Sequence, residues 1–238
     1  MSAPDLHLVV PCYRPRPGWG AQLGRRFTAF AKTQPVPVVL TLVHDGTPGG
    51  LDDEELVGLR SLVPGVQIID LPRNRGKGAA LRAGVLRAAG AAVTMYTDVD
   101  LPYTVESMRR VADHVRAHGG VAAGERFADY YQEVPAFRRR LSRLHRWLMR
   151  RAFRLPVSDS QAGLKAFDEG GREVFLATTV DRFLVDLDFI ARCRGRVAVA
   201  AVPVELRPDV TFTDFGLGIL RAEAANFVSI LRRSWLRG

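Results

Sequence analysis

Two aspartates, Asp98 and Asp100, stand one residue apart at the end of an apolar run, and their spacing gives the first indication of chemistry. The segment from Ala92 to Pro102 is typical of a buried parallel strand that ends in acidic residues. Open α/β sheets place their chemistry at the carboxyl ends of such strands. Two carboxylates there offer oxygen ligands to Mg²⁺ or Mn²⁺, whose other positions substrate phosphates and water can fill. Two acids in a surface turn would give the same pattern, so other stretches must decide.

Two further polar motifs also follow predicted strands. Asn74 to Gly78 places glycines and two cations at a helix start, where exposed backbone N–H groups and the positive helix end suit an anion. Lys77 is followed by glycine and not by Ser or Thr, so this is no Walker A loop. Asp45 precedes Gly46 after a strand, a place where a carboxylate can accept hydrogen bonds from a nucleobase or ribose. The structural alternatives are a plain strand–helix turn and an acid in a turn.

The carboxyl-terminal half offers more charged candidates. Arg126 follows a strand, where a guanidinium can clamp a phosphate in a bidentate way. Asp159 lies in a polar turn, and Asp186 and Asp188 lie in a segment too apolar for acids without a partner or a function. No Ser-His-Asp or Cys-His arrangement is recognisable, and the 5 histidines show no metal-binding spacing.

The elements that must position these residues alternate along the chain. Expected strands cover residues 6–12, 36–43, 66–71, 92–97, 121–127, 164–167 and 196–206. Expected helices cover residues 20–32, 51–62, 74–89, 103–118, 135–155, 170–193 with a break near Asp181, and 217–236. This alternation predicts an α/β fold with a mostly parallel sheet and helices on both faces, and the motifs after the first four strands would share one rim. Without repeats or linkers, the chain is expected to form a single domain.

The overall composition indicates an anionic partner. The formal net charge is +9, from 34 Lys and Arg against 25 Asp and Glu, which suits nucleic acid, a nucleotide, phosphate or a membrane surface. The 2 cysteines, Cys12 and Cys193, make neither a disulfide framework nor a zinc set, which fits a reducing cytosol. No signal segment follows Met1, and no run reaches the ~18 to 20 apolar residues of a membrane span. We expect a protein that is soluble or lies on a membrane.

Two predicted helices, at residues 135–155 and 217–236, combine arginines with an apolar stripe. The first carries Arg138, Arg139, Arg140, Arg143, Arg146, Arg150, Arg151 and Arg154 together with Trp147. A cationic amphipathic helix with a Trp suits an interface with anionic lipid. Nucleic acid is an alternative, although no helix-turn-helix, zinc or RNA-recognition signature accompanies the pattern. A core-packed helix with a solvated basic face is the structural alternative.

Taken in order, the motifs resemble family 2 of the inverting glycosyltransferases, which have the GT-A fold. They most resemble its polyprenyl-phosphate branch, which includes dolichyl-phosphate mannose and glucose synthases. The matching stretches are VVPCYRP (9–15), HDGT (44–47), NRGKGAALRAG (74–84), TDVDLP (97–102), GERF (124–127), SDSQAGLKAF (158–167), VDLDF (185–189) and VPVEL (202–206). They cover residues 6 to 207, and although each is short, their order is specific.

The resemblance implies a role for each matching residue. Pro11, Tyr13, Asp45, Lys77 and Asp98 would bind the nucleotide-sugar, with Asp98 near ribose and metal. Asp100 would hold the Mg²⁺ or Mn²⁺ that bridges the donor diphosphate, and Arg126, with Arg139 or Arg143 of the basic helix, would hold the acceptor phosphate. The resemblance also divides the domain into a nucleotide-sugar half, residues 1–102, and an acceptor half, residues 103–238. His44 stands where the family usually has an acid, which leaves UDP or GDP open, and Ala162 replaces the usual Cys.

The implied reaction is direct displacement at the anomeric carbon with inversion. A phosphate acceptor is already a nucleophile at pH 7, whereas a hydroxyl acceptor needs a general base, for which Asp186 or Asp159 is the candidate. We expect a polyprenyl phosphate acceptor, no nucleic-acid partner, and an enzyme peripheral to the cytoplasmic face of a membrane.

Three alternatives stay open. The first is a family 2 enzyme with a hydroxyl acceptor. The second is a nucleotidyltransferase, which would want a Gly-rich, Arg-containing loop where Pro11 to Pro15 stand. The third is a non-enzymatic basic protein that binds nucleic acid or membrane, and it gives Asp98 and Asp100 no purpose.

Overall fold

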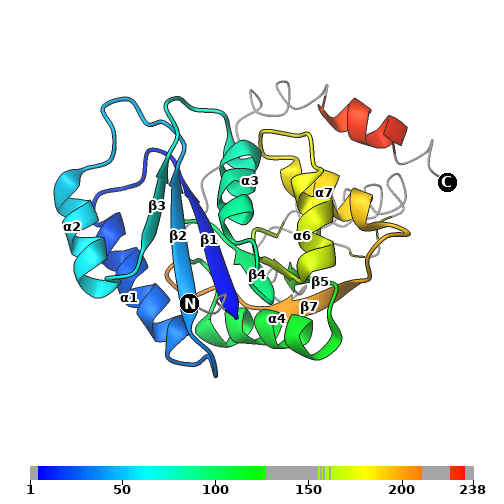
Figure 1. Ribbon diagram of the computed structural model, residues 1–238, viewed down its shortest axis with the longest axis horizontal. Coiled ribbons are helices and arrows are strands. Elements are labelled where there is room, and N and C mark those ends of the chain that lie inside the picture. Colours follow the sequence, from blue (N-terminus) through cyan, green and yellow to red (C-terminus); the bar gives the residue numbers. More distant parts are fainter. Residues whose placement is uncertain are drawn as a thin grey trace, which may run out of the picture.

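The protein forms one sheet with helices on both faces (Figure 1). This computed structural model describes residues 5–126, 155, 157, 159, 160, 162–210 and 226–233. Within them the strands are β1 (Leu6–Cys12), β2 (Val38–His44), β3 (Gln67–Asp70), β4 (Val93–Tyr96), β5 (Val121–Arg126), β6 (Lys165–Phe167) and β7 (Val199–Val204). The seven strands lie in the order β3-β2-β1-β4-β6-β5-β7. Each expected strand is confirmed, with ends that differ by a few residues.

One strand departs from a parallel arrangement. β6 runs antiparallel to both of its neighbours, β4 and β5, whereas β1, β2, β3 and β4 pair in parallel and β5 pairs in parallel with β7. The turn before β6 contains Asp159 and lies beside Arg126, at the carboxyl end of β5. A strand that starts at that rim must run away from it, which explains the reversed direction of β6.

Each face of the sheet has its own hydrophobic core. α1 (Trp19–Ala31), α2 (Asp53–Leu62) and α4 (Val105–His118) cover one face, and α3 (Lys77–Arg87), α6 (Glu169–Leu176) and α7 (Val185–Cys193) cover the other (Figure 1). Side chains of β1 alternate between these cores: Leu6, Leu8 and Val10 face the first, and Val9 faces the second. The period of two in a strand produces this division.

Local features fix where the helices begin and how closely they pack. α2 begins after Asp52, whose carboxylate accepts a hydrogen bond from the Glu54 amide at 2.8 Å, a typical N-cap. α3 approaches the sheet closely because Gly84 has no side chain. A Cβ at Gly84 would lie 2.3 Å from Val9 Cγ1, so any larger residue would push α3 away from β1. This close packing sets the position of Lys77, the first residue of α3.

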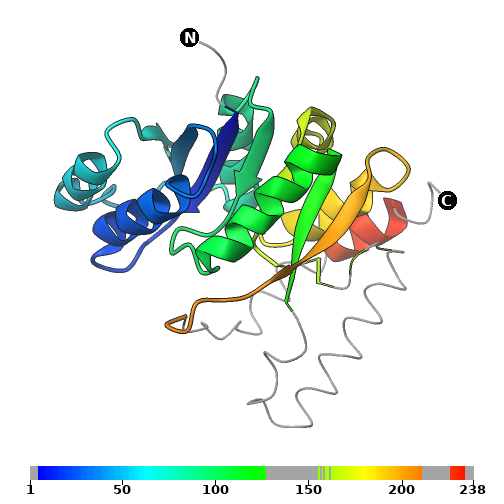
Figure 2. The same cartoon turned by 90° about the horizontal axis from the view of Figure 1, so that it is seen from below.

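The predicted amphipathic helices fall largely outside the described residues. The basic helix at 135–155, with Arg139 and Arg143, lies outside them except for Leu155, which is buried in the second core. Of the helix predicted at 217–236, residues 226–233 are described and helical, and Ile230 is buried in that core. This segment lies beside α7, at the opposite end of the molecule from α2 (Figure 2). No helix among the described residues is long and apolar enough to span a bilayer.

Candidate functional site

The polar motifs converge on one pocket at the carboxyl ends of the central strands. The pocket has a volume of about 330 Å³ and is lined by Pro11, Cys12, Tyr13, Asp45, Asn74, Gly76, Lys77, Asp98, Val99, Arg182 and Phe183. The chain passes from β1 to β2 on one side and returns to β4 on the other, so the pocket lies where the strand order reverses. Open α/β sheets bind ligands at this point. Thus five residues predicted to bind a nucleotide-sugar share one pocket.

Asp98 and Asp100 lie in the turn that follows β4. Asp98 Oδ1 is 2.8 Å from Lys77 Nζ, and its side chain remains 45% exposed. Desolvation, followed by the nearby charge of Asp98, raises the pKa of the Asp100 carboxyl. A divalent cation bound beside Asp100 would offset this effect and favour the ionised carboxylate. The donor set is therefore chemically suited to Mg²⁺ or Mn²⁺.

This pair of carboxylates is not a complete metal cage. Among the described residues, no group of three or more His, Cys, Asp or Glu side chains gathers closely enough to hold a metal ion. A cation held by Asp98 and Asp100 would take its other oxygen ligands from a bound diphosphate and from water, as Mg²⁺ commonly does. The site thus fits a metal that arrives with a phosphate-bearing substrate.

A glycine in the turn before β6 makes room for Asp98. A Cβ at Gly163 would lie 2.6 Å from Asp98 Oδ2 and 3.6 Å from Lys77 Nζ. Real Cβ atoms do not approach this closely, so any other residue at 163 would displace the Asp98 carboxylate. The sequence alone gives no sign that Gly163 is important, because the importance of this residue depends on a contact between distant segments.

A buried network of charged residues adjoins the pocket on the side of Lys77 that faces the protein interior. Asp186 Oδ1 accepts hydrogen bonds from Lys165 Nζ and from Tyr96 Oη, each at 2.6 Å, and Asp186 Oδ2 lies 3.8 Å from Lys77 Nζ. Burial raises the pKa of Asp186, but Lys165 and Lys77 outweigh it and the pKa is lowered. For Lys77, burial alone would lower the pKa, but the charges of Asp98 and Asp186 outweigh it and the pKa is raised. Asp186 and Lys77 therefore both stay charged.

Lys165 and Tyr96 are parts of this site that sequence reasoning missed. Lys165 is fully buried, and Tyr96 is among the largest buried side chains. The available signal was that lysine occurs in this arginine-rich chain only at positions 32, 77 and 165. A lysine inside the apolar stretch LKAF needs a buried anion, which the structure identifies as Asp186.

The loop before α3 differs from the prediction that its N–H groups are exposed to an anion. The Asp45 carboxylate accepts hydrogen bonds from the backbone N–H groups of Arg75 and Gly76, each at 2.8 Å. The N–H groups of Gly78 and Ala79 donate to the Asp181 carbonyl at 2.7 and 3.2 Å. These N–H groups are therefore occupied by acceptors of the protein itself, and Asp45 anchors the loop at the pocket wall. The cation of this motif that contacts Asp98 is Lys77.

Two arginines hold the turn that carries Asp100. Arg26 Nη1 donates to the Asp100 carbonyl at 2.6 Å, and Arg207 Nε donates to the Leu101 carbonyl at 2.8 Å. Leu101 has φ of 42°, a left-handed conformation that is unusual for leucine. These charge-assisted hydrogen bonds therefore stabilise a strained turn. The same arginines line a second pocket of about 400 Å³ that contains Asp100 and adjoins the first through Tyr13 and Val99.

Two predicted site residues form an ion pair with each other. Arg126 Nε and Nη2 donate to the two carboxylate oxygens of Asp159 at 2.7 and 3.2 Å. The Asp159 side chain is buried, and the guanidinium of Arg126 balances its charge. The prediction treated them as an acceptor clamp and a candidate base, and the structure brings them together as a bidentate pair.

The unusual His44 is explained by local hydrogen bonds. His44 Nδ1 lies 2.7 Å from Asp70 Oδ1, and its Nε2 accepts a hydrogen bond from the Thr47 N–H at 2.7 Å. The ring thus links β2 to β3 and is not among the residues that line the 330 Å³ pocket.

Comparison with known proteins places this geometry in a family. The family described as "Glycosyl transferase family 2" matches residues 9–180, which include every residue that lines the 330 Å³ pocket except Arg182 and Phe183. The chain belongs to this family and is a glycosyltransferase. No curated protein sequence matches the chain significantly.

Solved structures of glycosyltransferases share the fold. Mannosyl-3-phosphoglycerate synthase from Rubrobacter xylanophilus has a TM-score of 0.69 and 15% identity, covering 98% of this chain and 74% of that chain. Glucosyl-3-phosphoglycerate synthase from Mycobacterium tuberculosis, in complex with Mn²⁺, UDP-glucose and phosphoglyceric acid, has a TM-score of 0.63 and 14% identity, covering 97% and 79%. A mannosyltransferase from Pyrobaculum calidifontis, in complex with GDP-mannose and Mn²⁺, has a TM-score of 0.55 and 16% identity, covering 99% and 65%. This similarity establishes the GT-A fold.

Proposed function

We propose that the protein transfers a sugar, with inversion, from a nucleoside diphosphate sugar to a polyprenyl phosphate at the cytoplasmic face of a membrane. The observation that carries the acceptor class is the state of the two candidate general bases. Asp186 is buried against Lys165 with a lowered pKa, and Asp159 is paired with Arg126. A carboxylate with a lowered pKa, such as Asp186, is a poor proton acceptor at neutral pH, and both oxygens of Asp159 already accept hydrogen bonds from Arg126. An acceptor that needs no base is therefore favoured, and a phosphate is such an acceptor.

The donor half of the proposal rests on the convergence of Pro11, Tyr13, Asp45, Lys77 and Asp98 in one pocket. Asp98 and Asp100 would hold Mg²⁺ or Mn²⁺, and a divalent cation supplies charge neutralisation to a departing diphosphate. Lys77 keeps its ammonium beside Asp98 and orients that carboxylate. Asp186 holds the Lys77 ammonium in place and is itself held by Lys165, so both act as positioning residues. Solved structures with UDP-glucose or GDP-mannose and Mn²⁺ support a donor of this class.

A second candidate function has a specific observation in its favour. Two similar structures are synthases of sugar-phosphoglycerates, and one of them contains phosphoglyceric acid. A small acceptor that carries a phosphate would also suit a protein of net charge +9. The proposed donor site would be the same for either acceptor, so the lipid acceptor and the membrane location need a test of their own.

The donor site is tested by thermal unfolding with UDP or GDP, with and without Mn²⁺. We expect metal-dependent stabilisation by one nucleotide and its loss in Asp100→Asn, while Asp113→Asn, a surface carboxylate of α4, behaves as wild type. Absence of stabilisation by either nucleotide in the folded wild type would contradict the donor site.

The acceptor is tested with radiolabelled UDP-glucose and GDP-mannose offered with polyprenyl phosphate, polyprenol or 3-phosphoglycerate. Transfer to polyprenyl phosphate without transfer to polyprenol is the expected result. Transfer only to 3-phosphoglycerate would overturn the lipid acceptor and leave the donor site intact.

A further inference from the structure

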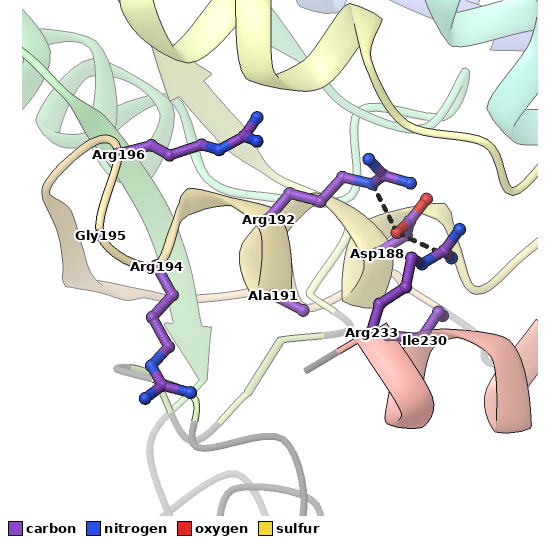
Figure 3. A pocket seen from close by; sticks show the side chains of 8 residues that line it. All are labelled: Asp188, Ala191, Arg192, Arg194, Gly195, Arg196, Ile230 and Arg233. Atoms are coloured by element: carbon purple, nitrogen blue, oxygen red, sulfur yellow. Dashed lines mark hydrogen bonds and ion pairs between the residues drawn. The ribbon is translucent and has the colours of Figure 1, made fainter. Parts of the chain in front are cut away.

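Another pocket, separate from the donor site, is lined by four arginines together with other side chains. It has a volume of about 280 Å³ and is formed by the end of α7, the loop that follows it, and the helix at 226–233. Its lining residues are Asp188, Ala191, Arg192, Arg194, Gly195, Arg196, Ile230 and Arg233 (Figure 3). None of them lines the 330 Å³ donor pocket.

Two of the arginines are held in fixed orientations. Arg192 Nε and Arg233 Nη2 donate to Asp188 Oδ1 at 2.7 and 3.3 Å, on either side of that carboxylate (Figure 3). The same two guanidinium groups donate to Thr179 Oγ1 at 3.2 and 2.8 Å. These contacts use part of each guanidinium fork and leave further N–H groups on both.

The oxygens of Asp188 are engaged on the protein side. Asp188 is 1% exposed, and its Oδ2 accepts hydrogen bonds from the backbone N–H groups of Thr179 and Val180 at 2.8 and 3.3 Å. Arg233 Nε is buried and makes no hydrogen bond within the part of the chain that the structure describes.

The charge balance of the pocket leaves an excess of positive charge. Arg196 enters from the loop after α7, whereas Arg194 points away from Arg192 and Arg233 (Figure 3). Among the lining residues that the structure describes, and leaving Arg194 out, three guanidinium groups stand against one carboxylate. The carbonyl end of α7 adds the equivalent of about half a negative charge. The remaining charge of about +1.5 complements a phosphate monoester, which carries about −1.5 to −2 at pH 7. Planar arginine forks also match phosphate oxygens geometrically.

We propose that Arg192, Arg196 and Arg233 form a binding site for a phosphate group, separate from the donor pocket. The shared chemistry is that of a phosphate monoester, either free in solution or as an anionic lipid headgroup. α7 connects the two sites. Its Asp186 contacts Lys77 of the donor pocket, and its Arg192 lies roughly 9 Å further along the helix axis. The proposal does not depend on the identity of the sugar acceptor.

The test uses two variants that keep a cation near Asp188. Arg196→Gln removes a guanidinium that makes no ion pair with a described residue, and Arg233→Lys keeps the charge beside Asp188 but loses the fork. Arg60→Gln, at an exposed position of α2, is the matched control. Stabilisation by inorganic phosphate is measured in EDTA, against chloride at equal ionic strength. Flotation with vesicles of phosphatidylcholine, with or without phosphatidic acid, is measured in parallel.

We expect each variant to weaken phosphate binding by roughly ten-fold or more, as for loss of one charge-assisted hydrogen bond, and Arg60→Gln to match wild type. Phosphatidic acid flotation that is lost in both variants assigns a lipid headgroup, and phosphate binding without flotation assigns a soluble ligand. Wild-type behaviour of both variants in both assays, or no phosphate effect on the wild type, overturns the proposal. Mn²⁺-dependent stabilisation of Arg196→Gln by UDP or GDP is measured as well, and it should match the wild type because Arg196 does not line the donor pocket.

Discussion

Lys165 and Asp186 form a buried ion pair, with Nζ 2.6 Å from Oδ1, and Lys77 links this pair to Asp98 in the candidate metal loop. Lys165 also donates to the Ala162 carbonyl at 2.6 Å, so the pair fixes the turn before β6 as well. One arrangement therefore positions both the carboxylate and the backbone that approaches it.

The first prediction concerns this ion pair. Lys165→Met removes the nearest cation and leaves Asp186 buried with Lys77 at 3.8 Å as its remaining ion-pair partner among the described residues. Breaking a buried pair on one side costs about 3–5 kcal/mol, whereas a well-packed apolar replacement of both partners is often neutral. Urea unfolding at pH 7 should show that loss for Lys165→Met and a recovery of most of it for Lys165→Met with Asp186→Leu. A single variant within 1 kcal/mol of wild type would show that the pair does not hold the site together.

The second prediction concerns Gly163. Gly163→Ala places a Cβ 2.6 Å from Asp98 Oδ2 and should displace that carboxylate. We expect Mn²⁺-dependent nucleotide affinity to fall by roughly ten-fold or more, as expected when a carboxylate ligand or its charge-assisted hydrogen bond is misplaced. Calorimetric titration with UDP or GDP measures the change.

Gly58→Ala is the control for Gly163→Ala. Gly58 lies inside α2, and a Cβ there meets nothing within 4 Å. The alanine should leave nucleotide affinity unchanged and raise stability by about 0.5–1 kcal/mol through helix propensity. Equal nucleotide affinities for the two variants would show that Gly163 has no special role at the site.

The third prediction concerns the arginine that holds the metal loop. Arg207 Nε and Nη2 donate to the carbonyls of Leu101 and Asp100 at 2.8 and 3.2 Å. Arg207→Gln should loosen this turn, which contains Leu101 at φ of 42°, and weaken Mn²⁺-dependent nucleotide binding. Arg109→Gln, which removes only surface ion pairs on α4, should leave both stability and nucleotide binding close to those of the wild type. Calorimetric titration distinguishes the two, and equal binding would contradict a positioning role for Arg207.

The fourth prediction is a pH dependence of stability that originates at His7. Burial and then the charge of Arg87 lower the pKa of His7 from 6.5 to about 4. His7 Nε2 lies 2.6 Å from Thr41 Oγ1, which is 3.3 Å from Gln67 Oε1, and Nδ1 has no hydrogen-bond partner among the described residues. Protonation would therefore place an unpaired buried N–H group and a charge inside the sheet.

The sign of the effect follows from the lowered pKa. The unfolded chain binds a proton at His7 below pH 6.5, whereas the folded chain does so only near pH 4, so stability is highest above 6.5 and falls as the pH decreases. The full difference is roughly 3 kcal/mol. Urea unfolding between pH 7.5 and 4 should show a shallower decrease for His7→Gln than for wild type. Parallel curves for the two proteins would assign the pH dependence to other groups.

The sequence by itself determined the elements of the sheet and the rim on which the chemistry lies. Each strand of β1, β2 and β4 is an apolar run that stops at a polar motif, and local periodicity is sufficient to identify such runs. Because parallel strands end at the same edge, Asp45, Lys77 and Asp98 were correctly predicted to lie together.

Only the tertiary structure decided which charges pair. Asp186 takes its hydrogen bonds from residues 21 and 90 positions away along the chain, and Arg126 pairs with Asp159 across 33 positions. Such contacts depend on how the elements pack and on the direction of β6, which local periodicity does not encode. The identity of an acid as a base, a ligand or a buried counter-ion is therefore set by its partners, and for Asp186 and Asp159 those partners are cations that the fold brings to them.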